Sequence, residues 1–121
     1  MKRTAIFVLV FALLVTPNAP AGSAVAWDGH GHTVSVHGFS GEESKQRALE
    51  LAQRLYGPNV KILTATDVSG YCAIAAARKG NRVVIGVALG RPSAADAERN
   101  AIKQCLIGGG TDPKVRWRFK G

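Results

Sequence analysis

Hydrophobic and polar residues alternate along several short stretches of the chain, and two longer stretches repeat their apolar residues at every third or fourth position. Alternation is typical of half-buried strands, whereas the longer repeat is typical of a helix with one buried face. Strands are predicted at 33–39, 60–67, 71–77, 82–89 and 115–120. Helices are predicted from about 40 to 56 and from about 93 to 107.

Each predicted helix begins with the same signal. Ser40 is followed three residues later by Glu43, and Ser93 is followed in the same way by Asp96. A serine and an acid at this spacing cap the first turn of a helix, because their side chains accept hydrogen bonds from amides that have no partner within the helix. Both helix starts are therefore predicted by local chemistry as well as by periodicity.

The two helical units align without a gap, residues 34–52 against residues 87–105. This match indicates an internal duplication, although two amphipathic helices with similar caps can also resemble each other by chance. The order strand, helix, three strands, helix, strand predicts an α+β fold. We expect one largely antiparallel sheet of about five strands with both helices on one face, which leaves the other face open.

The N-terminal segment has the pattern of a signal peptide. Met1-Lys2-Arg3 is cationic, and the apolar run Ala5–Val15 reaches only about half of a ~30 Å hydrocarbon core, which favours a signal peptide over a membrane anchor. Ala24-Val25-Ala26 supplies the small-x-small pattern that a signal peptidase needs, and Ala19-Pro20-Ala21 is a second candidate. We expect a secreted or periplasmic protein that is cleaved near Ala26.

This cleavage site defines the expected domain organisation. Residues 1–26 are the signal peptide, 27–32 a flexible N-terminal segment and 33–121 a single α+β domain. No membrane span remains after processing. Removing Lys2 and Arg3 lowers the net charge of the 121-residue chain from +8 to +6, so the protein stays basic. A basic balance favours an anionic partner.

Cations in the last strand alternate with apolar residues. Because side-chain direction repeats every second residue, Arg116, Arg118 and Lys120 point one way while Trp117 points the other. If Trp117 faces the helices, the three cations face solvent, and Lys61 and Arg82 join them on the open face. We expect this basic face to bind an anionic polymer, an anionic envelope component or an acidic protein; an ordinary solvated face is the alternative.

Nucleic acid is disfavoured as the partner. Recognition by base stacking needs aromatic rings and cations on one face, and here Trp117 and Phe119 alternate away from Arg116 and Arg118.

Cys72 and Cys105 are the only cysteines. In an exported protein a disulfide is favoured, and it would stabilise the fold by about 3–4 kcal/mol; two separate buried thiols are the alternative. A bridge requires Cys72 on the helix-covered face of its strand. Ile74 and Ala76 must then share that face, because they follow at two-residue spacing.

A second hypothesis for function is a metal-binding protein. Asp28, His30 and His32 project to one side of an extended chain, and a carboxylate with imidazoles suits zinc, copper or nickel. A solvent-exposed segment without a metal is the alternative.

An enzyme is not expected, because Ser40 and Ser93 are explained as helix caps and the sequence shows no paired nucleophile and base. No cofactor is implied.

Two motifs in the second half carry a family resemblance. Tyr71-x-Ala73-Ile74-Ala75 is similar to an aromatic-x-Ala-Ile-Ala strand, and residues 93–105 (SAADAERNAIKQC) are similar to a Ser-x-x-x-Ala-Glu-x-x-Ala-Leu-x-x-Cys helix. In both, the chain resembles domain-of-unknown-function family 4189, a family of small secreted bacterial domains. The resemblance covers roughly Tyr71 to Phe119 and implies no catalytic residue.

The chain departs from the family pattern in two places. Tyr71 stands where a tryptophan is usual. The family also tends to carry a further cysteine after the helix cysteine, and nothing after Cys105 supplies one.

Overall fold

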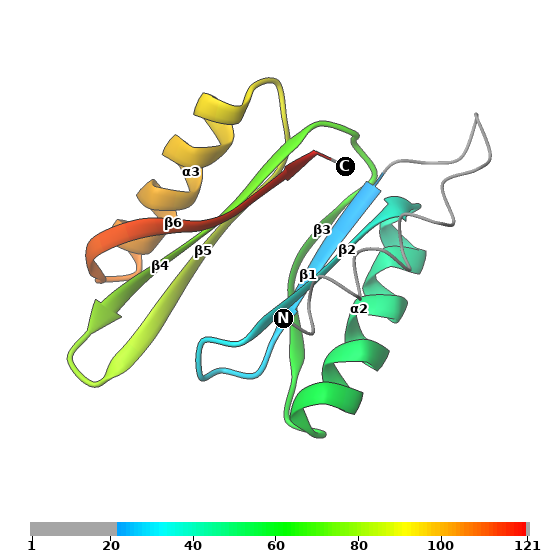
Figure 1. Ribbon diagram of the computed structural model, residues 1–121, viewed down its shortest axis with the longest axis horizontal. Coiled ribbons are helices and arrows are strands. Elements are labelled where there is room, and N and C mark those ends of the chain that lie inside the picture. The colour runs from blue at the N-terminus through cyan, green and yellow to red at the C-terminus, as the bar shows by residue number, and fades with distance from the viewer. Residues whose placement is uncertain (1–21, 121) are drawn as a thin grey trace.

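A computed structural model describes residues 22–120 (Figure 1). It contains six strands and two helices in the order β1 (Gly22–Trp27), β2 (Thr33–Phe39), α2 (Gly41–Tyr56), β3 (Lys61–Thr66), β4 (Tyr71–Lys79), β5 (Arg82–Arg91), α3 (Ala94–Ile107) and β6 (Thr111–Lys120). The predicted positions of both helices and of the hairpin between β4 and β5 are confirmed. Residues 1–21, which hold the basic and apolar parts of the predicted signal peptide and Ala19-Pro20-Ala21, lie outside the described residues.

The strands form two antiparallel sheets of three, in the orders β2-β1-β3 and β5-β4-β6. The α+β class is therefore confirmed, but the prediction of one sheet with about five strands was wrong. Each half of the chain runs strand, strand, helix, strand, and in each half the first strand lies in the middle of its sheet. The two halves thus have the same topology, with one strand more per half than the strand-helix-strand unit predicted.

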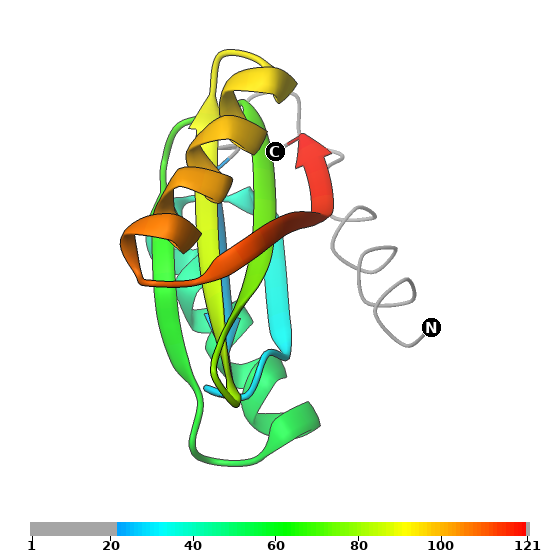
Figure 2. The same ribbon diagram turned by 90° about the vertical axis from the view of Figure 1, so that its left-hand side faces the viewer.

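The molecule is layered as helix, sheet, sheet, helix (Figure 1), and Figure 2 looks onto α3 with its sheet behind it. In β1, Ala24 and Ala26 pack against α2, while Val25 packs against the other sheet. In β4, Ala73 and Ala75 pack against α3, and the alternate residues face the first sheet. The prediction that both helices cover one face was wrong, because each helix covers the outer face of its own sheet.

β1 occupies residues that the sequence analysis assigned to the signal peptide. Ser23, Ala24, Val25 and Ala26 have no exposed surface, and the strand pairs with β2 on one side and β3 on the other. The expected cleavage site at Ala26 falls inside this strand. The expected flexible segment 27–32 is instead the end of β1 and the loop to β2. Within 22–120, no helix has the length and apolar character needed to cross a membrane.

Both helices begin as predicted. The Ser40 hydroxyl accepts a hydrogen bond from the Glu43 amide at 3.2 Å, and the Ser93 hydroxyl accepts one from the Asp96 amide at 3.1 Å. The alignment of the two units holds for the helices but not for the strand before them. Val34 packs against α2, whereas Val87 packs between the sheets.

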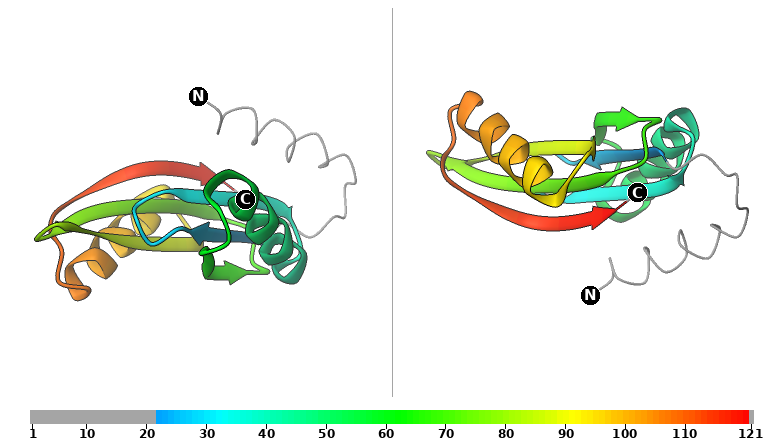
Figure 3. Two further views of the ribbon diagram at one scale, coloured as in Figure 1. Left: turned by 90° about the horizontal axis from the view of Figure 1, so that it is seen from below. Right: turned by 90° about the horizontal axis from the view of Figure 1, so that it is seen from above.

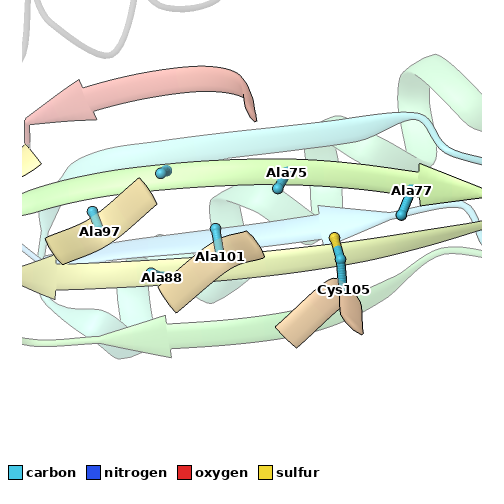
Figure 4. Close-up of a cluster of buried hydrophobic side chains, with 7 residues drawn as sticks. Ala75, Ala77, Ala88, Ala97, Ala101 and Cys105 are labelled. Carbon is cyan, nitrogen blue, oxygen red and sulfur yellow. The ribbon is translucent and has the colours of Figure 1, made fainter. Parts of the chain in front are cut away.

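Small residues bring α3 close to its sheet (Figure 4). The layer between them consists of the buried residues Ala73, Ala75, Ala77, Ala88, Ala97, Ala101 and Cys105. Gly86 in β5 is part of the same contact, because a Cβ there would collide with the carbonyl oxygen of Ala101. The helix backbone therefore packs almost directly on the strand, and any larger side chain in this layer would force the two apart.

The structure does not contain the predicted disulfide and agrees with the alternative of two buried thiols. Cys72 and Cys105 are both buried free thiols. Cys105 lies in the layer beneath α3, where its thiol donates to the carbonyl oxygen of Val84 at 3.8 Å. Cys72 lies on the other face of β4, 4.0 Å from the hydroxyl oxygen of Ser23 in β1. Because β4 separates the two sulfur atoms, they cannot be joined without turning the strand over.

Candidate binding cleft

A cleft of about 450 Å³ opens between the two sheets, at the end where the β1–β2 hairpin faces the β4–β5 hairpin. Its apolar lining is formed by Ile74, Ala76, Val83, Ile85 and Trp117, and its polar lining by His30, His32, Thr33 and Arg116. A concave site of this size with a largely apolar wall and a few polar groups is typical of small-ligand binding.

The cleft forms because the β4–β5 hairpin is longer than the β1–β2 hairpin that packs against it. The β4–β5 hairpin extends beyond the β1–β2 turn (Figure 3). The β1–β2 loop approaches the longer hairpin at Gly31, where a Cβ would stand 3.5 Å from a methyl carbon of Val83. Ala76 lines the cleft because the first sheet does not cover this end of β4.

A β-bulge places Arg116 in the cleft. Along β4, Ile74 pairs with Trp117, and the next residue, Ala75, pairs with Val115. Arg116 is therefore the extra residue of the bulge, and the alternation of side chains changes phase across it. Val115 packs in the α3 layer, while Trp117 packs between the sheets. The predicted basic face depends on Trp117 facing the helices, and because of the bulge this condition is not met.

The first half of the chain has the same bulge. Val25 in β1 pairs with Thr64, and Ala26 pairs with Ile62, so that Leu63 is the extra residue in β3. Leu63 packs in the core between the sheets. At the corresponding position, the second half carries the exposed Arg116. One half thus fills its bulge position with an apolar side chain, and the other directs a guanidinium group to an open cleft.

A second depression, of about 410 Å³, adjoins the cleft and shares Ala76, Val83 and Arg116 with it. It adds two cations, Arg78 and Lys114, and one acid, Asp112, whose carboxylate lies 3.9 Å from the Lys114 ammonium. The charge beside the cleft is therefore predominantly positive.

The five cations predicted to form one basic face are distributed over different parts of the molecule. Arg118 lies on the α3 side of β6, where it donates to the carboxylate of Glu98 at 2.6 Å. The Lys120 ammonium lies 5.1 Å from the centre of the Tyr71 ring. Lys61 begins β3 in the other sheet, and Arg82 stands at the turn of the β4–β5 hairpin. Of the five, Arg116 lines the cleft.

The predicted metal ligands belong to the β1–β2 loop. The Asp28 carboxylate accepts hydrogen bonds from the amides of His30 at 2.7 Å and His32 at 3.1 Å, and lies 2.6 Å from His32 Nδ1. Burial alone would raise the pKa of Asp28, but these contacts with His30 and His32 together lower it. The His32 ring also stacks on Tyr56.

This arrangement explains the three polar residues as supports of the hairpin. In the part of the chain that the structure describes, no group of three or more His, Cys, Asp and Glu side chains is placed to hold a metal ion.

The apolar lining of the cleft and the contributions of Arg78 and Lys114 are not predicted from the sequence. The apolar residues have the pattern of ordinary strand residues. One signal was available, because Leu63 and Arg116 are separated by the same interval as the two capping residues, Ser40 and Ser93. Extending the repeat as far as β6 would have shown a cation at a position that is apolar in the first half.

Comparisons with protein-family models, with curated proteins and with solved structures found no match to this chain. The resemblance to domain-of-unknown-function family 4189 therefore stays a prediction.

Proposed function

We propose that this is an exported, non-catalytic binding protein whose cleft holds a small amphipathic anion, with a carboxylate or phosphate head at Arg116 and an apolar body against Trp117. The single observation that carries this proposal is the position of Arg116. It stands at a bulge that is filled by Leu63 in the other half, and within 22–120 it has no carboxylate partner.

Charge and shape together favour a small ligand over a flat polyanion. The cations are divided among both sides of the second sheet and the far sheet, so they form no common surface. At the cleft, by contrast, Arg116 lines the same cavity as the apolar side chains of Ile74 and Ile85. A guanidinium group binds carboxylate and phosphate with two parallel hydrogen bonds, and the apolar wall favours a ligand that also buries hydrocarbon.

Binding rather than catalysis fits the polar groups of the lining. His32 is the histidine held by a carboxylate, but its ring stacks on Tyr56 of α2. Its hydrogen bond to Asp28 is part of the loop that forms one wall of the cleft. These contacts support a structural role for His32, so no proton-transfer role is proposed for it.

The proposal is tested with sodium dodecanoate as the probe, titrated into the protein at low salt while Trp fluorescence is recorded. We expect saturable binding, because Trp117 lines the cleft, and weaker binding as the salt concentration rises. Acetate lacks the apolar body and dodecanol lacks the charge, so both should bind at least about tenfold more weakly.

Two matched variants locate the binding site. Arg116→Leu reproduces the residue of the first half and should weaken dodecanoate binding by about tenfold or more without loss of stability. Arg118→Leu removes a neighbouring cation on the α3 side and should leave the affinity unchanged. Equal binding by wild type and Arg116→Leu would refute the proposal. So would binding of polyglutamate with no binding of dodecanoate, which would instead favour an acidic protein as the partner.

A further inference from the structure

The middle strand of the first sheet contains the site at which the sequence predicts signal-peptide cleavage. Ala24 and Ala26 are fully buried against α2, and Ser23 and Val25 are fully buried against the second sheet. All six residues of β1 pair with β2, and five of them also pair with β3.

Cleavage after Ala26 would remove five of the six residues of β1. β2 and β3 would then lose the strand that lies between them. The backbone amides and carbonyls with which they pair to β1 would be left without partners inside the protein. The inner residues of α2, Ala48 and Ala52, would lose the surface on which they pack. A small domain is only marginally stable, so the loss of a middle strand and of the surface beneath α2 would unfold it.

Gly22 is the first residue of β1 and is buried at the ends of the two neighbouring strands. A Cβ at this position would collide with the carbonyl oxygens of Thr66 and Phe39, the last residues of the two neighbouring strands, and would also crowd the amide of Gly41 at the start of α2. Glycine is therefore required at this position, and a chain that begins here keeps all six residues of β1.

We propose that a signal peptidase hydrolyses the peptide bond between Ala21 and Gly22, so that the exported protein begins at Gly22. Water adds across this bond, which leaves a carboxylate on Ala21 and an ammonium group on Gly22. Ala19 and Ala21 supply the two small residues that the peptidase pocket admits, and they lie nearer to the apolar run than Ala24 and Ala26 do. This inference rests on the proposed export of the protein, but not on the proposed ligand.

To test this, the full chain is expressed in a bacterial host, and the intact mass of the protein in the exported fraction is measured. We expect the exported fraction to contain residues 22–121. A product that begins at Trp27 would overturn the inference while leaving export intact. An uncut chain confined to the cytoplasm would overturn both the inference and the export on which it rests.

Variants outside the strand keep this test independent of folding. Ala21→Gln should block processing at this bond and leave the exported chain longer, whereas Ala21→Ser keeps a small residue and should be processed as the wild type is. Normal cleavage of Ala21→Gln would contradict the proposed site. In a second measurement, chains 22–121 and 27–121 are produced directly. Only the first should show a cooperative thermal transition, and equal transitions would remove the structural reason for the inference.

Discussion

The hydroxyl oxygen of Ser23 lies 4.0 Å from the sulfur atom of Cys72, in the buried contact between the two sheets. The two residues hold corresponding places in the two halves, since each precedes the Ala-x-Ala segment of a middle strand. The sheets meet there through small side chains. This contact fixes Cys72 on the inner face of β4, whereas Cys105 lies beneath α3.

The first prediction concerns these two thiols. A thiol titration in denaturant under non-reducing conditions should detect two free thiols per chain, and the native protein should react slowly because both sulfur atoms are buried. Burial raises the pKa of Cys105, although the amide of Gly86 partly offsets it, so the reactive thiolate is further depleted. Addition of a reducing agent should leave Tm unchanged. A fall in Tm on reduction would show that a disulfide contributes to stability.

The second prediction tests the close contact between α3 and its sheet. Ala101→Leu should lower the free energy of unfolding by about 1–3 kcal/mol, because three additional carbon atoms must enter a layer made of alanines. Ala95→Leu is the matched control, since Ala95 is exposed on the same helix and the same substitution should change stability by less than about 0.5 kcal/mol. Chemical denaturation measures both. Equal effects of the two substitutions would contradict the packing described for α3.

The third prediction concerns pH. Burial lowers the pKa of His37, which stacks on Phe119 between the sheets. As the pH falls, His37 is therefore protonated in the unfolded chain first, at about pH 6.5, and in the folded protein only at a lower pH. The contribution to stability is complete above that value and is lost as the pH falls from about 6.5 toward the folded-state pKa, at about 1.4 kcal/mol per pKa unit.

Denaturation at pH 7.5 and pH 5.5 measures this effect. The wild type should be less stable at pH 5.5, and His37→Gln should lose most of the difference. His30→Gln is the control, because His30 is exposed in the β1–β2 loop and its replacement should leave the pH dependence unchanged. A dependence that survives in His37→Gln would assign the titration to another group.

Local chemistry was sufficient to predict the helices, their serine caps and the β4–β5 hairpin, because each depends on residues close together in the sequence. β1 was missed because small residues serve two purposes. The Ser-Ala-Val-Ala segment fits the pocket of a signal peptidase, and it also fits a strand packed closely beneath a helix. Its likeness to the Cys-Ala-Ile-Ala segment of β4 was the signal that could have separated the two interpretations.

The candidate site was predicted less well than the fold. Arg116 was predicted as a binding residue, but the residues predicted to share its site were the other cations, whereas the structure places apolar side chains in the same cleft. Strict alternation along β6 predicts one basic face, and the bulge breaks that alternation between Val115 and Trp117. A bulge depends on pairing with the neighbouring strand, so the sequence of β6 alone could not locate it. The inner wall of the cleft also depends on contacts between segments that are distant in the sequence, so it could not be predicted from any one segment.

The central claim, that the cleft beside Arg116 is the binding site, is tested most directly by NMR titration of the isotope-labelled protein with dodecanoate. We expect the largest amide shifts in the β1–β2 loop, at the inner face of the β4–β5 hairpin and around Arg116, and we expect Arg116→Leu to need at least about tenfold more dodecanoate to reach the same shifts. Shifts concentrated on the outer faces of α2 and α3, or an identical titration of the cleft in Arg116→Leu, would contradict the account.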